Sequence, residues 1–512
     1  MSFSYASRSL TTTGLFILST TCLLYILIQR VLLYQQRRRF AKQNKCLPVT
    51  AFPHKDPIYG LDLFITNTHA ARDGKFVETL EKRYQSLGVH TFSSIFLGTT
   101  TINTVDVENI KTMLATGFKD FELAPQRKSA MEPVFGQGIF ILEGKGWEHS
   151  RAMLRPNFVR SQLADLPVFE RHVEKLIARI PKNGETVDLS TLFFMLTIDS
   201  ATDFLFGEST NTLDETKVDS AGHRYSEAYD YLSEEVGQEI RLGKLTNLFP
   251  NKKYRDALSY VHSYVRTYVD KALALQASNP PSQAPKETNS GRYIFLEQLA
   301  KSGYSAQKIQ AELLNILLAG RDTTASLLTL LFMSLSQNQD VLEKLRKEVL
   351  ALEGRRPSYE EVKDMKYLRW CVNETLRLYP VIPTTNRVAS RDTVLPRGGG
   401  PDGKSPIMVK KGSLMIWSPY VLHRRKDIYG EDADKFRPER WEKLRVAWEY
   451  VAFGGGPRMC IGQQFALTEA SYTTVRLLQA FSKMESRDAR PFTELLTLTM
   501  SNKWGCKVGL YE

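Results

Sequence analysis

The feature that most constrains this chain is a glycine-rich stretch near its C-terminal end, Phe453-Gly454-Gly455-Gly456-Pro457-Arg458-Met459-Cys460-Ile461-Gly462. It holds one cysteine at the end of a turn whose glycines permit positive φ and close approach of the main chain to a flat ligand. The helix-forming run from Phe465 to Ala470 follows, so we expect Cys460 to lie just ahead of a helix N-terminus, which favours negative charge. Amide N–H groups in the turn can also point at the sulfur. The stretch therefore predicts a cysteine thiolate, the form of the side chain that binds metal.

A long apolar stretch from Ala311 to Leu335 has a helical pattern but breaks local preferences at its centre. There the chain reads Ala319-Gly320-Arg321-Asp322-Thr323-Thr324, although a glycine, an acid and two β-branched hydroxyl residues are poor choices inside a buried helix. Local rules are broken most often where function requires it. We expect the small residues to leave room for a diatomic ligand, and Thr323 to open the helix ladder as a bulge. Taken alone, the Asp-Thr-Thr run fits a helix cap equally well.

Two further pairs of residues are spaced to share a helix face. Trp147 and Arg151 are four residues apart, and an indole N–H together with a guanidinium suits a carboxylate ligand. Glu374 and Arg377 are three residues apart within otherwise apolar surroundings. Each pair alone is also common on an ordinary protein surface, so its interpretation depends on the cysteine stretch.

Together these stretches resemble the cytochrome P450 superfamily. The pattern Phe-x-x-Gly-x-Arg-x-Cys-x-Gly, met at Phe453, Gly456, Arg458, Cys460 and Gly462, resembles the haem-ligand loop of that superfamily. The resemblance implies that Cys460 is the axial ligand of the iron of a haem b group. The alternative is a buried structural cysteine in a glycine-rich turn, which does not account for a match at all five positions.

The same resemblance assigns roles to the other motifs. It implies that Asp322 and Thr323 relay protons to iron-bound dioxygen. It also implies a buried structural clamp behind the cysteine loop, made of Glu374, Arg377 and Arg440. The residues implied for the haem propionates are Trp147, Arg151, Arg387 and Arg458. The residues implied for the substrate pocket are Phe140, Ala319, Thr324, Ile382 and Thr384.

The fold that the resemblance implies is mainly α: a helical cytochrome P450 domain with a small β-rich subdomain, preceded by one N-terminal transmembrane helix. Strand-forming pieces at 90–97 and 101–105 predict a small sheet, and 160–275 reads as a run of amphipathic helices. The polar, turn-rich stretch 276–291 predicts a surface loop inside one domain, although its composition would also suit a linker.

The N-terminal segment predicts a membrane anchor. Residues 11–28 are uncharged and mostly apolar, and the apolar segment just reaches the length of about 20 residues that a bilayer core requires. Arg37–Arg39 follow it and should stay in the cytosol by the positive-inside rule. A cleaved signal peptide is the alternative, but no small-x-small cleavage site follows. We expect residues 1–36 to be a signal anchor, 37–59 a basic and Pro-rich connector, and 60–512 the catalytic domain, in a single-pass protein of the endoplasmic reticulum membrane with that domain in the cytosol.

Charge and cysteine content exclude several classes of protein. The formal net charge is +12, but residues 1–55 contain eight Lys/Arg and no Asp/Glu, so the remainder carries only about +4 and no nucleic-acid motif accompanies it. The five scattered cysteines include no Cys-x-x-Cys pair, which argues against a disulfide framework, a zinc site and c-type haem. No Gly-x-Gly-x-x-Gly follows a predicted strand. We therefore expect electrons from a separate NADPH–cytochrome P450 reductase, with cytochrome b5 as a further candidate donor.

The resemblance covers nearly the whole chain and is closest to the fungal group that oxidises n-alkanes and fatty acids. The stretches that carry it, besides the cysteine loop, are Gly138-Ile139-Phe140, Gly146-Trp147, Ser150 to Pro156, Asp199 to Thr202, Phe204 to Glu208 and Gly462 to Ala470. It implies a monooxygenase that uses O2 to hydroxylate an apolar substrate, such as a long-chain fatty acid or an alkane. Thr384-Thr385-Asn386 is more polar than the usual pattern of that group, which favours a functionalised chain or a polyketide-derived product instead.

Three alternative functions follow from the same residues. The first is a tailoring oxidase of a polyketide or terpenoid pathway. The second is a hydroperoxide isomerase or dehydratase with the same fold, and the third is a haem-binding or scaffold protein without enzymatic activity. The intact Asp322-Thr323 pair argues against the second, and the pair together with the complete cysteine loop argues against the third.

Overall fold

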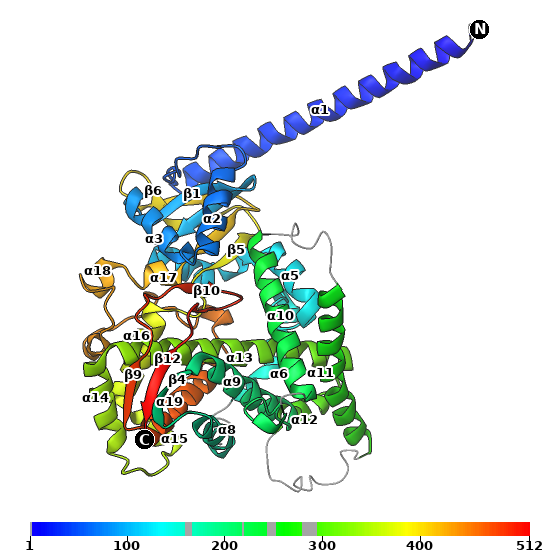
Figure 1. Ribbon diagram of the computed structural model, residues 1–512. Helices are drawn as coiled ribbons and strands as arrows, with labels where there is room; N and C mark the ends of the chain where they lie inside the picture. Colours follow the sequence, from blue (N-terminus) through cyan, green and yellow to red (C-terminus); the bar gives the residue numbers. More distant parts are fainter. Residues whose placement is uncertain (1–2, 159–165, 218–219, 243–251, 279–293) are drawn as a thin grey trace.

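A computed structural model describes residues 3–158, 166–217, 220–242, 252–278 and 294–512, and shows a mainly helical body from which one long helix projects (Figure 1). The α-helices are α1 (Phe3–Gln43), α2 (Leu61–Arg72), α3 (Phe76–Leu87), α4 (Val107–Lys111), α5 (Pro125–Phe135), α6 (Gly144–Leu154), α8 (Leu166–Ala178), α9 (Leu189–Phe206), α10 (Ala221–Leu242), α11 (Lys252–Ser278), α12 (Phe295–Ala300), α13 (Ala306–Gln337), α14 (Gln339–Leu350), α15 (Tyr359–Asp364), α16 (Lys366–Leu378), α17 (Pro419–Leu422), α18 (Lys426–Tyr429) and α19 (Gln463–Ala480). The strands are β1 (Thr91–Phe96), β2 (Thr99–Thr104), β3 (Phe121–Glu122), β4 (Asn183–Asp188), β5 (Thr385–Ala389), β6 (Thr393–Gly399), β7 (Ser405–Val409), β8 (Leu414–Trp417), β9 (Lys483–Ser486), β10 (Glu494–Leu496), β11 (Met500–Asn502) and β12 (Lys507–Tyr511). Three short segments near the site are the π-helix η1 (Thr112–Thr116) and the 3-10 helices η6 (Pro438–Glu442) and η7 (Gly456–Arg458).

Helix α13 runs through the middle of the body and is buried along most of its length (Figure 1). Apolar residues occur on every side of it, and Leu317, Leu328, Leu331 and Phe332 are fully buried, as expected for a helix in the centre of a large core. α9, α11, α16 and α19 pack against it. Each fully buried leucine contributes about 2 kcal/mol to folding. This packing fixes the polar stretch 319–324 relative to the cysteine loop, which immediately precedes α19.

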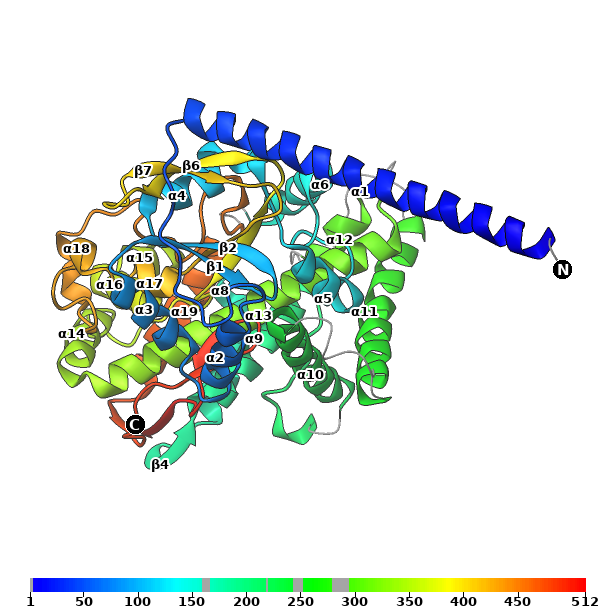
Figure 2. The same cartoon turned by 90° about the horizontal axis from the view of Figure 1, so that it is seen from above.

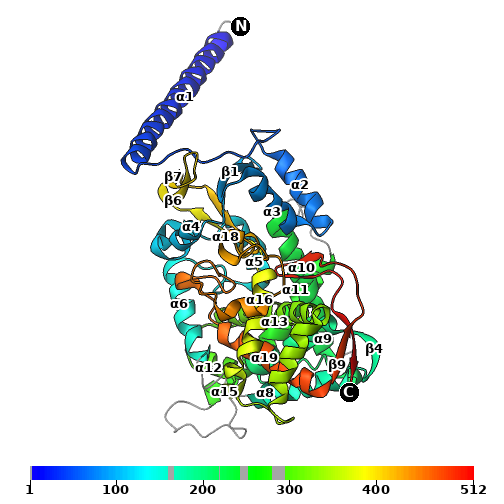
Figure 3. The same cartoon turned by 90° about the vertical axis from the view of Figure 1, so that its left-hand side faces the viewer.

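The predicted small sheet is present and has the strand order β1-β2-β8-β5-β3. β2 and β8 run parallel, whereas the other neighbours are antiparallel. The hydroxyl groups of Thr91 and Thr104 bond across β1 and β2 at 2.8 Å, because these residues face each other in the register. The β6–β7 hairpin turns through Gly400 and Gly403, both at positive φ. Figure 3 shows β1, β6 and β7 between α1 and the helical body. Strand β5 contains Arg387, one of the residues predicted to contact a propionate.

Helix α1 is a candidate membrane anchor. Three helices in the described part of the chain are long and apolar enough to span a membrane, but α9 and α13 are 78% and 83% buried inside the body, whereas the Leu18–Gln43 part of α1 is 0% buried. Figure 2 shows the N-terminal part of α1 extending past the body, and Figure 1 shows that the helix rises away from it. The hydroxyl of Thr20 donates to the carbonyl of Phe16 at 2.8 Å, which satisfies a polar group inside the apolar segment.

The anchor helix does not end at residue 36. It continues to Gln43, because residues 37–43 contain good helix formers and neither glycine nor proline, so the start of the expected connector is helical. The guanidinium of Arg37 donates twice to Asp392, at 2.9 Å in each case. Farther along, the amide of Leu47 donates to a carbonyl of the β6–β7 hairpin at 2.9 Å. The connector is therefore attached to the β6–β7 hairpin.

Most of the helices predicted within 160–275 are present as α8, α9, α10 and α11. Residues 160–165, 218–219 and 243–251 lie outside the described residues. For the loop predicted at 276–291, α11 continues through Ser278, and 279–291 lie outside the described residues. The prediction of a mainly helical fold with a small β-rich part is confirmed.

Candidate functional site

The glycine-rich stretch folds into a tight loop against the π-helix η1. Gly454 and Gly456 have φ of 71° and 64°, the region that favours glycine. A Cβ on Gly456 would lie 1.8 Å from the carbonyl oxygen of Leu114, so only glycine fits at this position. The amide of Cys460 donates to the carbonyl of Phe453 at 3.0 Å and closes the loop. The loop therefore holds Cys460 in one place by main-chain contacts.

Cys460 lies just ahead of α19, as the sequence predicted. Gly462 is the N-cap of that helix, and its amide donates to the cysteine sulfur. Burial of the sulfur by surrounding protein atoms raises the pKa of the thiol, whereas the Gly462 amide and the charge of Arg151 lower it. Cys460 nevertheless has an exposed surface. An accessible sulfur with one amide donor and one nearby cation suits a thiolate whose charge is completed by a bound metal.

Trp147 lies between two arginines beside this loop. The guanidinium carbon of Arg458 is 4.5 Å from the Trp147 ring centroid and that of Arg151 is 6.0 Å away. Arg151 donates to the carbonyl of Met459 at 3.0 Å, which ties α6 to the loop. Among the described residues, the indole N–H of Trp147 donates to no protein group. The predicted Trp147–Arg151 pair therefore lies at the loop with an unused donor.

Arg387 and Arg458 join a third cation that the sequence did not reveal, Arg127 on α5. Burial, and then the charges of Arg127 and Arg458, lower the pKa of Arg387 to about 9. Glu143 accepts from Arg458 at 2.6 Å, and no carboxylate in the described part of the chain forms an ion pair with Arg127 or Arg387. The cluster of Arg127, Arg387 and Arg458 thus has more positive charge than the protein compensates, although buried charges normally have partners.

These observations fit a haem group. Its two propionates would supply the negative charge that Arg127, Arg387 and Arg458 lack, and the indole N–H of Trp147 is free to donate to one of them. Its iron would take the sulfur of Cys460 as axial ligand. Arg127 was missed because its sequence context, near the start of a short helix after Pro125, has no motif; only the fold brings α5 to Arg387 of β5.

The middle of α13 differs from the prediction in one respect. The helix is continuous α-helix from Ala306 to Gln337, so the expected bulge at Thr323 is absent from it. The Thr323 hydroxyl donates to the carbonyl of Ala319 at 2.5 Å. That carbonyl has two lone pairs and can accept from the hydroxyl while it also accepts from the helix ladder. Ala319 and Thr323 are partly exposed and lie one turn apart, whereas the Thr324 side chain is buried and its hydroxyl has no partner among the described residues.

Asp322 points away from that partly exposed face. Its carboxylate is buried and accepts from Arg321 at 2.8 Å. Burial raises the pKa of Asp322, although the charge of Arg321 partly offsets that rise. Asp322 therefore takes up a proton more readily than an ordinary aspartate. Asp322 and Thr323 are adjacent in sequence, but the structure shows no direct hydrogen bond between their side chains.

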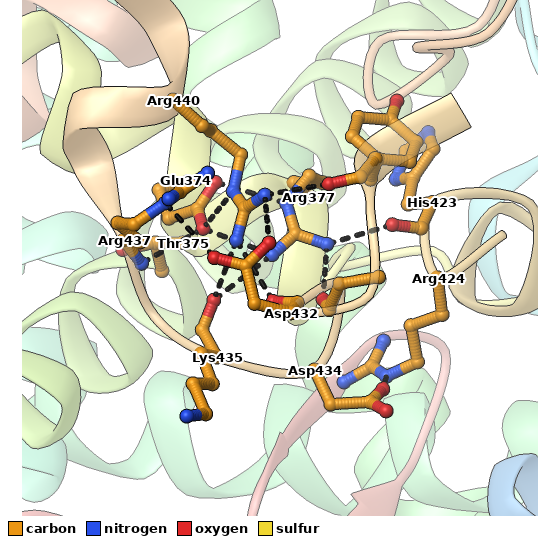
Figure 4. Close-up of polar contacts among 12 residues, drawn as sticks. Glu374, Thr375, Arg377, His423, Arg424, Asp432, Asp434, Lys435, Arg437 and Arg440 are labelled. Atoms are coloured by element: carbon orange, nitrogen blue, oxygen red, sulfur yellow. Dashed lines mark hydrogen bonds and ion pairs between the residues drawn. The ribbon is translucent and has the colours of Figure 1, made fainter. Parts of the chain in front are cut away.

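The predicted clamp of Glu374, Arg377 and Arg440 is assembled in the core (Figure 4). Arg377 donates to both Glu374 carboxylate oxygens at 2.9 Å, and Arg440 donates at 2.8 Å. The sequence did not predict two further donors: the backbone amide of Arg437 at 2.9 Å and the indole of Trp441 at 3.0 Å. All three predicted side chains are almost completely buried, so the carboxylate and its two cations stabilise each other without solvent.

The clamp is linked to the cysteine loop through His423. Arg377 donates to the His423 carbonyl at 2.8 Å, and the imidazole Nε2 accepts from the amide of Val451 at 3.0 Å. Burial and the charge of Arg377 lower the pKa of His423 to about 3, so the ring stays neutral and can accept. Val451 precedes Phe453 by two residues. This chain of contacts fixes the entry to the loop.

The predicted pocket residues come from separate elements. Phe140 lies between α5 and α6, and two α13 side chains, which the sequence did not single out, hold its loop. Asn315 accepts from the Phe140 amide at 3.2 Å, and Glu312 accepts from the Ile139 amide at 3.1 Å. Ile382 and Thr384 precede β5; Ile382 is 39% exposed and Thr384 is partly buried.

The chain is similar to known proteins over most of its length. The family model described as Cytochrome P450 matches residues 57–504. The chain is 44% identical over 494 residues to the cytochrome P450 monooxygenase himC of Aspergillus japonicus, a match that covers 96% of this chain and 88% of that protein. It is 40% identical over 494 residues to cytochrome P450 52A13 of Debaryomyces hansenii, covering 92% and 93% of the two chains. It is 43% identical over 436 residues to cytochrome P450 52A1 of Candida tropicalis, covering 81% and 79%.

Proposed function

Because this chain belongs to the cytochrome P450 family and is a haem-thiolate monooxygenase, we propose that it hydroxylates a long-chain fatty acid or an alkane. The oxygen chemistry rests on the cysteine loop together with the uncompensated cations beside it. When bound, the haem supplies the activation of O2, with electrons from a separate reductase. The residues below hold the group, orient the substrate and carry protons.

We propose that Cys460 binds the iron and that Arg127, Arg387, Arg458 and Trp147 hold the propionates. The positions of these side chains on four different elements would fix the haem plane relative to α13. Arg387 and Arg458 donate through planar guanidinium groups, which suit carboxylates in a two-bond geometry. The arrangement supports a haem held at its edge by charge and at its centre by one sulfur.

Asp322 and Thr323 are proposed to carry protons toward the bound haem. Asp322 has a raised pKa because it is buried, so a proton resides on its carboxyl group closer to neutral pH than on an exposed aspartate. Thr323 presents its hydroxyl one turn from Ala319 on the partly exposed face. A rotation of the Asp322 side chain away from Arg321 would be needed for a direct transfer to Thr323.

The lipid substrate is supported by the stretches that resemble the fungal alkane and fatty-acid group, and by the apolar side chains of Phe140, Ala319 and Ile382. A specific observation favours the alternative, a tailoring oxidase acting on a functionalised or polyketide-derived product. Thr384 and Asn386 are polar, are not fully buried and lie just before Arg387, one of the residues proposed to hold the propionates. A pocket that includes them would accept a substrate with oxygen atoms.

Optical titration of the purified holoprotein distinguishes a lipid substrate from a functionalised or polyketide-derived one. Displacement of water from the iron by a substrate moves the ferric Soret band to shorter wavelength. A saturable shift with long-chain fatty acids or alkanes, followed by reductase-dependent hydroxylation, supports the proposal. A shift only with aromatic or polycyclic ligands rejects the lipid assignment in favour of the tailoring oxidase. Turnover of a hydroperoxide without reductase would instead favour an isomerase or dehydratase.

We also propose a single-pass location in the endoplasmic reticulum membrane with the catalytic domain in the cytosol. The basic cluster that follows the apolar part of α1, including Arg37, supports this orientation. The electron donor would be NADPH–cytochrome P450 reductase, with cytochrome b5 as an additional candidate. Protease treatment of sealed microsomes should digest the catalytic domain; its protection would place the domain in the lumen.

A further inference from the structure

Arg321 on α13 is shared by two carboxylates from two different helices. Its Nη1 is 2.8 Å from the carboxylate of Asp322, the next residue on α13, and also forms an ion pair with Asp230 on α10. The side chains of Arg321 and Asp322 are each 4% exposed, whereas that of Asp230 is 50% exposed. Figure 1 shows α10 crossing α13. The buried arginine therefore joins the candidate proton carrier to a helix at the edge of the body.

The rest of the arginine is held by aromatic rings and not by hydrogen bonds. Its guanidinium carbon is 4.8 Å from the Phe194 ring on α9 and 5.9 Å from the Tyr229 ring on α10. Its Nε is buried and has no hydrogen-bond partner among the described residues. An aromatic face attracts a cation without a directional hydrogen bond. The rings therefore leave Nη1 free to bond to the two carboxylates, Asp322 and Asp230.

The charges of this group do not balance. One guanidinium faces two carboxylates, so neither Asp322 nor Asp230 has a cation to itself. Two tyrosines of α10 also lie near this group: Tyr229 is near Asp322 and Arg321, and Tyr225 is near Arg321. Both are buried, and their hydroxyl groups have no partner among the described residues. Asp230, which is half exposed, is the partner that can leave, because water can replace its ion pair.

We propose that Arg321 is a positioning residue that couples the seating of α10 on α13 to the proton-carrying state of Asp322. While α10 packs on α13, Asp230 and Asp322 share the positive charge of Arg321. The negative charge of Asp322 is then neutralised only in part, so Asp322 can bind a proton and release it toward Thr323. When α10 moves away, Arg321 pairs with Asp322 alone and holds it as a carboxylate. Proton delivery would then be restricted to the state in which α10 covers α13. The inference rests on the proposed proton role of Asp322.

The proposed coupling predicts the direction in which each substitution shifts the pH dependence of turnover. Burial raises the pKa of Asp322, the charge of Arg321 lowers it, and the charge of Asp230 raises it again. Removing the Asp230 charge should therefore lower the pKa of Asp322, so that its carboxyl group is protonated less often at a given pH. Removing the Arg321 charge should raise that pKa. The two substitutions are expected to displace the high-pH limb of turnover in opposite directions.

The experiment compares Asp230→Asn with Glu234→Gln in the full-length holoprotein with reductase. Glu234 is exposed on the same helix, so its replacement removes the same charge without touching Arg321. We expect Asp230→Asn to reduce the product formed per NADPH several-fold, to raise hydrogen peroxide release, and to move the high-pH limb down by about one pH unit. Asp230→Glu should restore both quantities, and Arg321→Gln should move the limb upward.

A second measurement does not depend on turnover. Hydrogen exchange of the α10 amides, 221–242, should become faster in Asp230→Asn than in Glu234→Gln, because the tie to α13 is lost. Equal exchange and equal product per NADPH in these two variants would overturn the coupling. If Asp322→Asn itself leaves product per NADPH unchanged, the proposed proton role of Asp322 fails instead. If Asp322→Asn lowers it while Asp230→Asn matches the control, only the coupling fails.

Discussion

Replacing Glu469 by glutamine should make the folded protein more stable at neutral pH and have a much smaller effect on its stability in mild acid. Glu469 lies on α19 and is buried against α9, where the hydroxyl of Ser200 is its hydrogen-bond donor. Burial raises the pKa of Glu469 to about 8, and the Ser200 hydroxyl offsets only part of the rise. The unfolded chain should titrate near the ordinary glutamate value of about 4.3. The folded state therefore holds a proton that the unfolded state has already lost.

The size of the effect follows from these two values. Between about pH 4.5 and 8 the folded state binds more protons than the unfolded state, so stability falls as the pH rises through this window. The slope is at most about 1.4 kcal/mol per pH unit, which gives about 3 kcal/mol between pH 5 and 7.5. Glutamine keeps an oxygen that accepts from Ser200 but does not ionise. The gain of the variant over the wild type should therefore be about 3 kcal/mol larger at pH 7.5 than at pH 5.

Denaturant unfolding of the two holoproteins, followed by circular dichroism at each pH, measures the difference. Comparison at matched pH cancels the contributions of haem release and of other titrating groups. Glu343→Gln on α14 is the control, because it removes an exposed carboxylate and should give a difference that does not change with pH. A Glu469→Gln difference that is equally flat would refute the argument, since it would mean that the carboxyl group is charged in the folded protein.

Three further substitutions test the haem-binding loop and the groups that support it. Glu374→Ala should leave two buried guanidiniums without their carboxylate, cost about 3–5 kcal/mol and lower the haem-to-protein ratio; a wild-type ratio would contradict the role of the clamp. Gly456→Ala should lower the same ratio sharply, because the new Cβ meets a carbonyl of η1, whereas Gly454→Ala has the same backbone strain in open space and should do so less. Arg127→Ala should speed haem loss to apomyoglobin several-fold relative to the exposed neighbour Lys128→Ala, and equal rates would remove Arg127 from the site.

The parts of the site that the sequence predicted are those encoded by short, fixed spacings. The cysteine loop, the Trp147–Arg151 face and the Glu374–Arg377 pair each lie within one turn or one helix, so their geometry follows from local backbone rules. Arg440 was placed by resemblance, and the structure brings it to the same carboxylate at 2.8 Å. The structure therefore places together the residues that short spacings and the resemblance had grouped, and their roles stay predictions.

The remaining parts depend on contacts between distant segments. Arg127 reaches Arg387 only because α5 and β5 meet, and nothing in either segment indicates it. The bulge predicted at Thr323 was wrong because a threonine hydroxyl can share a helix carbonyl without breaking the ladder, so a polar residue in a buried helix does not by itself open that helix. Likewise, the need for glycine at 456 comes from Leu114, a residue more than 300 positions away in the chain.

The contacts that join α1 to the body would couple the orientation of the body to that of α1 in a membrane. The mostly apolar part of α1 runs from Thr11 to Tyr34, with Arg30 as its one charged residue, and is about 36 Å long at 1.5 Å per residue, longer than a hydrocarbon core of about 30 Å. A helix of that length accommodates to the bilayer by tilting. Arg37 is bonded to Asp392, and the segment after α1 is hydrogen-bonded to the β6–β7 hairpin. No flexible linker therefore separates the helix from the body, and a change in the tilt of the helix should be passed on to the body. In a thicker membrane the helix should tilt less, and the body should rotate with it. Bilayer thickness would then determine which face of the enzyme is presented to a partner in the same membrane.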